Sequence, residues 1–231
     1  SSSVPLDSPP EAAAAAREQR RLCRLAIRLL HTPLPRSGPE AAYLFQELDV
    51  NVESVVEGAA QLARQRPETL LLICNVSNER LGVPLPGGYG ATRYLLERLD
   101  AAGVERSRLE LTEFDHSGMI HTLLEAQTAV RHAKARGWRS LAVVAPAFHL
   151  LRAALTTASV ARREYPELRV HPVSGTPLSW REEAVHSQGM VGERADFIDS
   201  ELDRVVRYVA KGDILPLHEL EAYFADCEAS G

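Results

Sequence analysis

The sequence predicts an α/β fold with a mainly parallel sheet that helices cover on both faces. Apolar runs of strand length, such as TLLLIC at 69–74 and RSLAVVA at 139–145, alternate with segments whose apolar residues recur at helical spacing. This alternation is typical of βαβ units, in which a crossover helix leads to the next parallel strand. The 231 residues suffice for one such domain with a sizeable core.

Residues 1–35 are predicted to precede the domain as a flexible lead-in and an amphipathic helix, and residues 36–231 form the domain itself. Within the helix, an apolar stripe contains Leu22, Leu25, Ala26, Leu29 and Leu30, and arginines occupy much of the remaining surface. We expect this helix to dock on the domain with a solvated basic face. A helix that binds a membrane surface or a partner is the alternative.

The predicted elements of the domain then follow in order. Strands are expected at 41–48, 69–74, 107–114, 139–145 and 168–174. Helices are expected at 50–66, 91–102, 117–136, 147–164, 193–211 and 216–227. Gly103 and Gly137 are placed to end two of these helices, because glycine readily adopts the left-handed conformation of a helix C-terminus. The segments at 75–90 and 175–192 are predicted to be loops.

The composition narrows the functional class. Hydrophobic residues make up 45% and charged residues 25%, as in ordinary globular proteins. The net charge of -5 argues against a dedicated nucleic-acid binder, which needs a basic face. The three cysteines are far apart and form no CxxC pair, which favours a reducing compartment and a cytoplasmic location. Neither a transmembrane segment nor a signal peptide is expected.

The polar and titratable side chains gather in the loops that follow the predicted strands. In a parallel sheet these loops share the edge where ligands bind. The ARGWRS and REYPEL segments at the opposite edge are ordinary turn sequences. We therefore predict a ligand site at the carboxyl ends of the strands, lined by Asn75, Asn78, Asp115, His116, Phe148, His149, His186 and Gln188.

Two helices that begin at this edge add candidate site residues. His121 and Glu125 are four positions apart and can point to one site, although a surface His–Glu pair is the alternative. Phe148, His149 and Arg152 lie in the first turns of the next helix. A helix N-terminus carries partial positive charge, and an arginine adds a donor fork, so this helix start suits a carboxylate or phosphate. Alternatively, Arg152 pairs with a structural acid and His149 only caps the helix.

Several common motifs are missing. The chain has no P-loop, no GxSxG elbow and no HExxH pair. The histidines at 116, 121, 149 and 186 match no metal-ligand spacing, so no metal is predicted. GGYG at 87–90 indicates a turn or a loop that covers a ligand. Cys74 is expected to be a small buried hydrophobe.

LAVVAPAFHLLRA at 141–153 resembles the strand and T-x-x-F/Y-H-x-x-R-A motif of the DUF218 family, which includes the YdcF-, SanA- and ElyC-like proteins. HTLLEA at 121–126 is similar to the family's N-T-x-E-E-A helix start, with Glu125 on the second glutamate and departures at His121 and Leu124. Gly87 and Gly88 resemble the family's glycine pair after the second strand, although a loop of about a dozen residues precedes them here. The resemblance covers roughly residues 45–175, and the tail WREEAVHSQG looks like that of a soluble bacterial subgroup.

This resemblance implies a Rossmann-like three-layer sandwich with Glu125, His149 and Arg152 as site residues. One branch of the family binds S-adenosylmethionine, and membrane-anchored branches are linked to cell-envelope polysaccharide.

We therefore expect an enzyme, a transferase or a hydrolase, that acts on or with a small anionic metabolite such as S-adenosylmethionine or a nucleotide-like molecule. Arg152 would bind the anion, and His149 and Glu125 would transfer protons. A non-catalytic small-molecule binding protein and a cell-envelope-associated factor are the alternatives. The ligand, the reaction and the formation of a homo-oligomer stay open.

Overall fold

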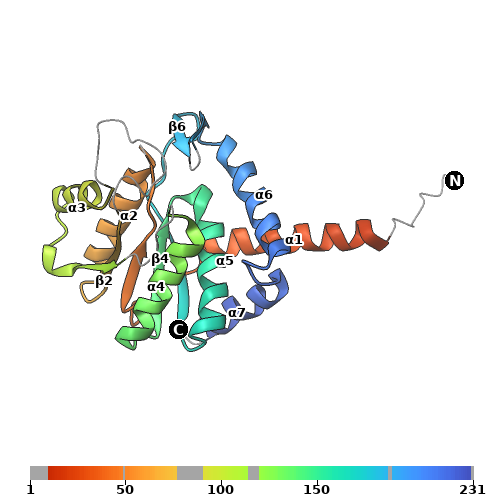
Figure 1. Cartoon of the computed structure of the whole chain (residues 1–231), viewed down its shortest axis with the longest axis horizontal. Helices are drawn as coiled ribbons and strands as arrows, with labels where there is room; N and C mark the ends of the chain where they lie inside the picture. Colours follow the sequence, from red (N-terminus) through yellow and green to blue (C-terminus); the bar gives the residue numbers. More distant parts are fainter. Residues whose placement is uncertain (1–9, 49, 77–90, 114–119, 187–188, 230–231) are drawn as a thin grey trace.

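A computed structural model describes residues 10–48, 50–76, 91–113, 120–186 and 189–229 (Figure 1). These residues form a five-stranded parallel sheet flanked by helices and a separate two-stranded antiparallel hairpin. The predicted α/β fold is confirmed as a Rossmann-like three-layer sandwich. The predicted lead-in at 1–9 lies outside the described residues.

The helices and strands alternate through most of the chain. Their bounds are α1 (Pro10–His31), β1 (Ala41–Leu44), α2 (Asn51–Gln65), β2 (Leu70–Asn75), α3 (Ala91–Ala101), the 3-10 helix η2 (Arg106–Arg108), β3 (Leu109–Glu113), α4 (Thr122–Arg136), β4 (Ser140–Ala145), α5 (Ala147–Glu164), β5 (Arg169–Ser174), β6 (Glu183–His186), β7 (Met190–Glu193), α6 (Asp196–Lys211) and α7 (Leu217–Ala229).

The strand order of the sheet is β3-β2-β1-β4-β5. The first residue of β1, Ala41, aligns with Leu70 of β2 on one side and with Leu141 of β4 on the other. The chain builds outward from β1 in one direction through β2 and β3. It then returns to add β4 and β5 on the other side. The order therefore reverses between β1 and β4, and ligands of doubly wound sheets bind beyond the carboxyl ends of such a pair.

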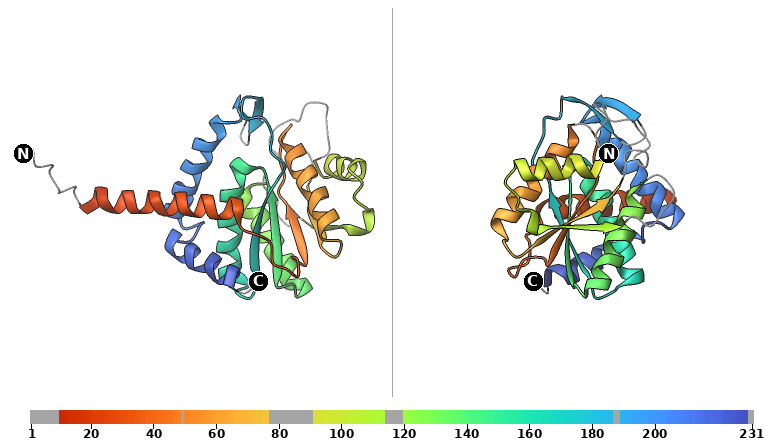
Figure 2. Two further views of the ribbon diagram at one scale, coloured as in Figure 1. Left: turned by 180° about the vertical axis from the view of Figure 1, so that it is seen from behind. Right: turned by 60° about the vertical axis from the view of Figure 1, so that its left-hand side comes forward.

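Alternating side chains of the strands form two hydrophobic cores, because successive residues of a strand point to opposite faces. Tyr43 and Val143 belong to the core that α1, α4, α5 and α7 cover, whereas Leu44 and Val144 belong to the core under α2 and α3. Figures 1 and 2 show α2 and α3 on one side of the sheet and α4, α5 and α7 on the other. Gly137 has a φ of 70° and ends α4, as predicted.

Helix α1 extends outward from the domain at its N-terminal end (Figure 2). Leu22, Leu25 and Leu29 are buried in the core, but Leu30 of the predicted stripe is exposed. The expectation of a solvated basic face holds only in part. Arg21 and Arg24 bind Glu221, and Arg28 binds Glu228, so three of the arginines meet carboxylates of α7.

The hairpin of β6 and β7 lies where the sequence predicts a loop and the start of a helix. Its four-residue strands, EAVH and MVGE, carry little apolar periodicity. The strands are therefore recognised by their antiparallel pairing and not by a pattern in the sequence of either one. Because β7 takes residues 190–193, α6 begins at Asp196 instead of 193. Within the described part of the chain, no helix has the length and apolar character that crossing a membrane requires.

Candidate functional site

The switch point between β1 and β4 is bridged by a glutamate and a histidine. The chain leaves β1 at Leu44 and reaches Glu47 three residues later, while β4 ends at Ala145 and α5 places His149 in its first turn. Glu47 Oε1 lies 2.5 Å from His149 Nδ1, and each side chain is only 5% exposed. The two ends of the central strands are thus joined by a buried hydrogen bond.

Thr122, the first residue of α4, extends this contact. Its Oγ1 lies 3.3 Å from Nε2 of His149 and also accepts a hydrogen bond from Nη1 of Arg152. A continuous chain therefore runs from Glu47 through the imidazole to the Thr122 hydroxyl. Beside it, the His149 ring packs edge-on against Phe45, at 5.6 Å between ring centroids, which fixes the imidazole plane.

The carboxylate of Glu201, on α6, lies at the centre of a second set of contacts. Arg152 binds it in bidentate fashion, with Nε 2.5 Å from Oε2 and Nη2 3.0 Å from Oε1. Nε2 of His186 lies 2.7 Å from Oε1, and Nη1 of Arg204 lies 3.2 Å from the same atom. Glu201 thus connects α5 to the β6–β7 hairpin and to its own helix.

An aromatic group covers this part of the cluster. The rings of Phe148 and Phe197 meet edge to face at 5.5 Å, and the His186 ring stacks on Phe197 at 4.9 Å with an interplanar angle of 28°. All three side chains are buried. Apolar contact on both sides lowers the local dielectric and strengthens the charge interactions of Glu201.

The hairpin is tied to α2 by a buried arginine that follows β7. Nε of Arg194 donates to Oδ1 of Asn51 at 3.0 Å, and Nη2 donates to Glu182 at 2.7 Å. Asn51 in turn donates to the backbone carbonyl of Val185 at 2.8 Å. These bonds hold β6 in the position from which His186 reaches Glu201.

Glu125 lies one turn into α4, next to β1. Its Oε1 accepts hydrogen bonds from the Tyr43 hydroxyl at 3.1 Å and from the backbone N–H of Gln46 at 2.9 Å. Burial raises the pKa of Glu125 to about 7, although these two bonds and Arg152 act in the opposite direction. The carboxyl group therefore exchanges a proton near neutral pH.

The Glu47–His149 pair is held in its uncharged form. Burial raises the pKa of Glu47 well above its ordinary value, and the nearby carboxylates of Glu201 and Glu125 add to this. Burial also lowers the pKa of His149 well below its ordinary value, with a further contribution from Arg152. A protonated Glu47 then donates to Nδ1, and Nε2 of the imidazole carries its hydrogen toward Thr122.

Glu201 behaves in the opposite way. Burial acts to raise its pKa, but the Arg152 guanidinium and the hydrogen bond with His186 outweigh burial and hold the pKa of Glu201 well below its ordinary value. The site therefore contains one carboxylate whose pKa is lowered beside two carboxyl groups whose pKa is raised. Environments that separate the pKa values of neighbouring acids are typical of acid–base sites.

The structure brings together several of the predicted site residues. Phe148, His149, Arg152 and His186 lie in one cluster, and Glu125 contacts the strand that leads into it. His121 immediately precedes α4 and is exposed, whereas Glu125 is buried, so these two side chains occupy different environments. Asn75 ends β2 and is exposed. Five predicted residues lie outside the described part of the chain: Asn78, Gly88, Asp115, His116 and Gln188.

The other members of the cluster were not predicted from the sequence. Glu47 follows a weak first strand, Thr122 stands within the HTLLEA segment, and Glu201 and Arg204 lie on the amphipathic helix α6. Of these residues, only Thr122 is marked by the sequence, because it matches the threonine of the N-T-x-E-E-A motif. Arg152 does pair with an acid, as the structural alternative for it proposed, while the prediction that it binds a ligand anion stays a prediction.

Neither protein-family models nor curated proteins match this chain. Among the residues that the structure describes, no group of three or more histidine, cysteine, aspartate and glutamate side chains is arranged to hold a metal ion.

Proposed function

We propose that this protein is an enzyme that acts on a small anionic metabolite at the carboxyl ends of β1 and β4, with His149 as the proton-transferring residue. The observation that carries the proposal is the Glu47–His149–Thr122 chain at the switch point of the sheet. Ligands of doubly wound folds bind at this place.

The chain can act as both an acid and a base. With Glu47 protonated, Nε2 of His149 carries a hydrogen and can donate it. After the pair has lost one proton, the Glu47 carboxylate accepts a hydrogen bond from Nδ1–H of His149. Nε2 is then unprotonated and can accept a proton from a hydroxyl group. Proton transfer of this kind serves the leaving group or nucleophile of a hydrolase or transferase.

The charge balance favours an anionic substrate. Arg152 and Arg204 contribute two positive charges beside Glu201, which contributes one negative charge, while Glu47 and His149 are held uncharged. Two guanidinium groups thus lie against one buried carboxylate, and guanidinium groups also bind the oxygens of a carboxylate or phosphate.

A purely structural role accounts poorly for this arrangement. Placing several ionisable groups out of water costs free energy that apolar side chains of similar volume would not. Such groups with shifted pKa values cluster at functional sites. The F-H-x-x-R-A segment, which suggested a DUF218-type protein, supplies Phe148, His149 and Arg152 of the cluster. On that resemblance we propose S-adenosylmethionine as the first ligand to test.

The test begins with thermal unfolding of the whole chain in S-adenosylmethionine, adenosine monophosphate and inorganic phosphate. A ligand at a hundredfold excess over its Kd stabilises the folded state by about 2.7 kcal/mol, which gives a clear shift in Tm. Mass spectrometry of the incubated mixture then reports any product. If none of these anions shifts the Tm, the result would count against an anion-binding site.

Two variants separate catalysis from binding. We expect His149→Asn and Glu47→Gln to lower product formation at least a hundredfold while the ligand still shifts Tm. His132→Asn is the matched control, because His132 forms a similar contact of 2.6 Å with Glu110 but at a partly exposed position. Binding with no product from the unmodified chain would instead identify a non-catalytic binding protein.

A further inference from the structure

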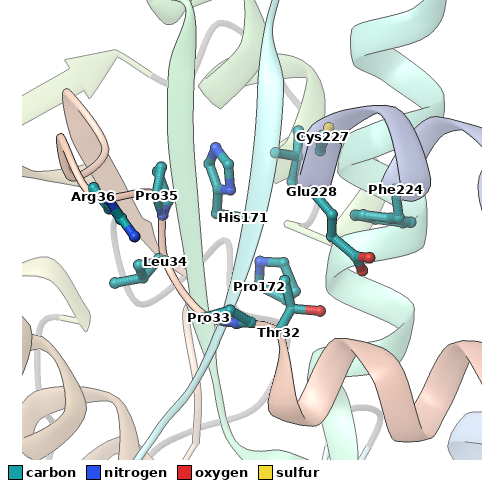
Figure 3. A pocket seen from close by; sticks show the side chains of 11 residues that line it. Thr32, Pro33, Leu34, Pro35, Arg36, His171, Pro172, Phe224, Cys227 and Glu228 are labelled. Atoms are coloured by element: carbon teal, nitrogen blue, oxygen red, sulfur yellow. The ribbon is translucent and has the colours of Figure 1, made fainter. Parts of the chain in front are cut away.

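A cavity of about 260 Å³ lies beside β5, the edge strand of the sheet, where the segment between α1 and β1 passes α7 (Figure 3). It shares no lining residue with the cluster at the ends of β1 and β4. Its walls come from residues 32–36, from β5 and from α7. The cavity is thus a separate feature of the fold.

Most of the wall is apolar and rigid. Leu34, Val170 and Phe224 line it together with three prolines, Pro33, Pro35 and Pro172. A proline is compatible with β5 because this strand is an edge and needs no N–H on its outer side. Proline rings have a fixed φ, so this wall loses little conformational entropy when a ligand contacts it.

One polar group of the lining, His171, lies on the opposite face of β5 from Val170 and Pro172, because successive residues of a strand alternate between faces. His171 is only 5% exposed, and Figure 3 shows its ring among the labelled lining residues. Within the described part of the chain, no residue makes a hydrogen bond to this ring. Burial lowers the pKa of His171 to about 4, with a smaller contribution from Arg169, so the imidazole is neutral at physiological pH. It offers one donor and one acceptor nitrogen.

The remaining polar groups of the lining are already satisfied or lie at the rim. Glu228 binds Arg28 at 2.9 Å, and the Thr32 hydroxyl donates to the backbone carbonyl of Arg28 at 2.7 Å. Arg36 is exposed to solvent. Burial raises the pKa of Cys227, so its side chain is a neutral thiol. The interior therefore presents no charge and one unused hydrogen-bonding ring.

We propose that this cavity is a second ligand site, which binds a small, uncharged and mainly apolar molecule through one hydroxyl or N–H group bonded to His171. The volume is below the range of about 300–1,000 Å³ for pockets that hold drug-sized molecules, so it suits a ligand the size of phenol or indole. A neutral partner matches the uncharged interior, where a carboxylate would lose hydration without a paired cation.

Nuclear magnetic resonance of the whole chain tests the proposal, with the side-chain signals of His171 as the readout. We expect phenol to shift these signals in a saturable way. Toluene has the same shape without the hydroxyl group, and benzoate adds a charge. Toluene should bind about tenfold more weakly, because one hydrogen bond contributes roughly 1–1.5 kcal/mol. Benzoate should also bind more weakly than phenol, because its carboxylate would lose hydration without a paired cation. Equal affinity for phenol and toluene, tighter binding of benzoate, or no saturable shift with phenol would each overturn the proposal.

Two variants locate the site. His171→Phe should lower phenol affinity to that of toluene, read from the signals of neighbouring β5 residues. Pro33→Trp should block the cavity from an exposed position where a change has little effect on folding. His132→Phe, on α4, is the control and should bind phenol normally. Unchanged phenol binding in both cavity variants would contradict the assignment. None of these outcomes depends on the proton-transfer chain of Glu47, His149 and Thr122.

Discussion

Helix α5 contributes to two bidentate arginine–glutamate pairs that differ in burial. Arg152, near its start, binds Glu201 through two hydrogen bonds, and these side chains are 5% and 3% exposed. Glu164, its last residue, accepts two hydrogen bonds from Arg131, and these side chains are 30% and 53% exposed. The geometry is similar, but only the buried pair has given up its hydration, so only this pair depends strongly on both partners.

The largest expected effect comes from breaking the buried pair. Arg152→Met leaves the Glu201 carboxylate buried with less compensation and removes the donor to Thr122. We expect the free energy of unfolding to fall by about 3–5 kcal/mol, measured by urea denaturation. A loss below about 1 kcal/mol would show that water reaches Glu201 and that the two pairs are equivalent.

A pH dependence is expected from Glu125, a buried acid with a raised pKa. The pKa of Glu125 is raised from 4.5 to about 7 in the folded protein. The unfolded chain therefore releases this proton at lower pH. The contribution of protonated Glu125 to the free energy of unfolding is fully present below pH 4.5 and is lost as the pH rises through 7.

Glu125→Gln removes this dependence, because the amide stays neutral at every pH. Relative to this variant, the natural chain should lose about 3 kcal/mol of unfolding free energy between pH 4.5 and pH 8, at about 1.36 kcal/mol per pKa unit. Urea denaturation over a pH series measures the difference. A constant difference would mean that Glu125 keeps an ordinary pKa.

A smaller effect is expected at Thr122, which joins the proton-transfer chain to the arginine. Thr122→Val keeps the shape but removes the acceptor for Nη1 of Arg152, and we expect a cost of about 1–3 kcal/mol. Thr122→Ser keeps the hydroxyl group and should recover most of this loss. Chemical denaturation of both variants makes the comparison. Equal stability of the two would show that the hydroxyl group contributes little.

The smallest effect is expected at the exposed pair. Arg131→Met should change the free energy of unfolding by less than about 1 kcal/mol, and 1 M salt should reduce the difference further because exposed charges are screened. Thermal unfolding at low and high salt tests this. A salt-independent loss as large as that of Arg152→Met would remove the distinction between the two pairs.

The local sequence predicted most of the domain and one side of the site. Apolar runs such as that of β4 mark buried parallel strands. The 147–164 helix was predicted with the bounds that the structure has, and it places Phe148, His149 and Arg152 in adjacent turns. The hairpin was missed because its short strands carry no apolar pattern of their own.

The sequence by itself determined the alternation of strands and helices and the position of His149 and Arg152 at a helix start, because these depend on residues close together in the chain. Only the tertiary structure decided their partners. Glu47 is 102 positions from His149, and Glu201 is 49 positions from Arg152. No local sequence pattern can indicate contacts between residues so far apart in the chain. The strand order brings Glu47 to His149, and the packing of α6 on α5 brings Glu201 to Arg152.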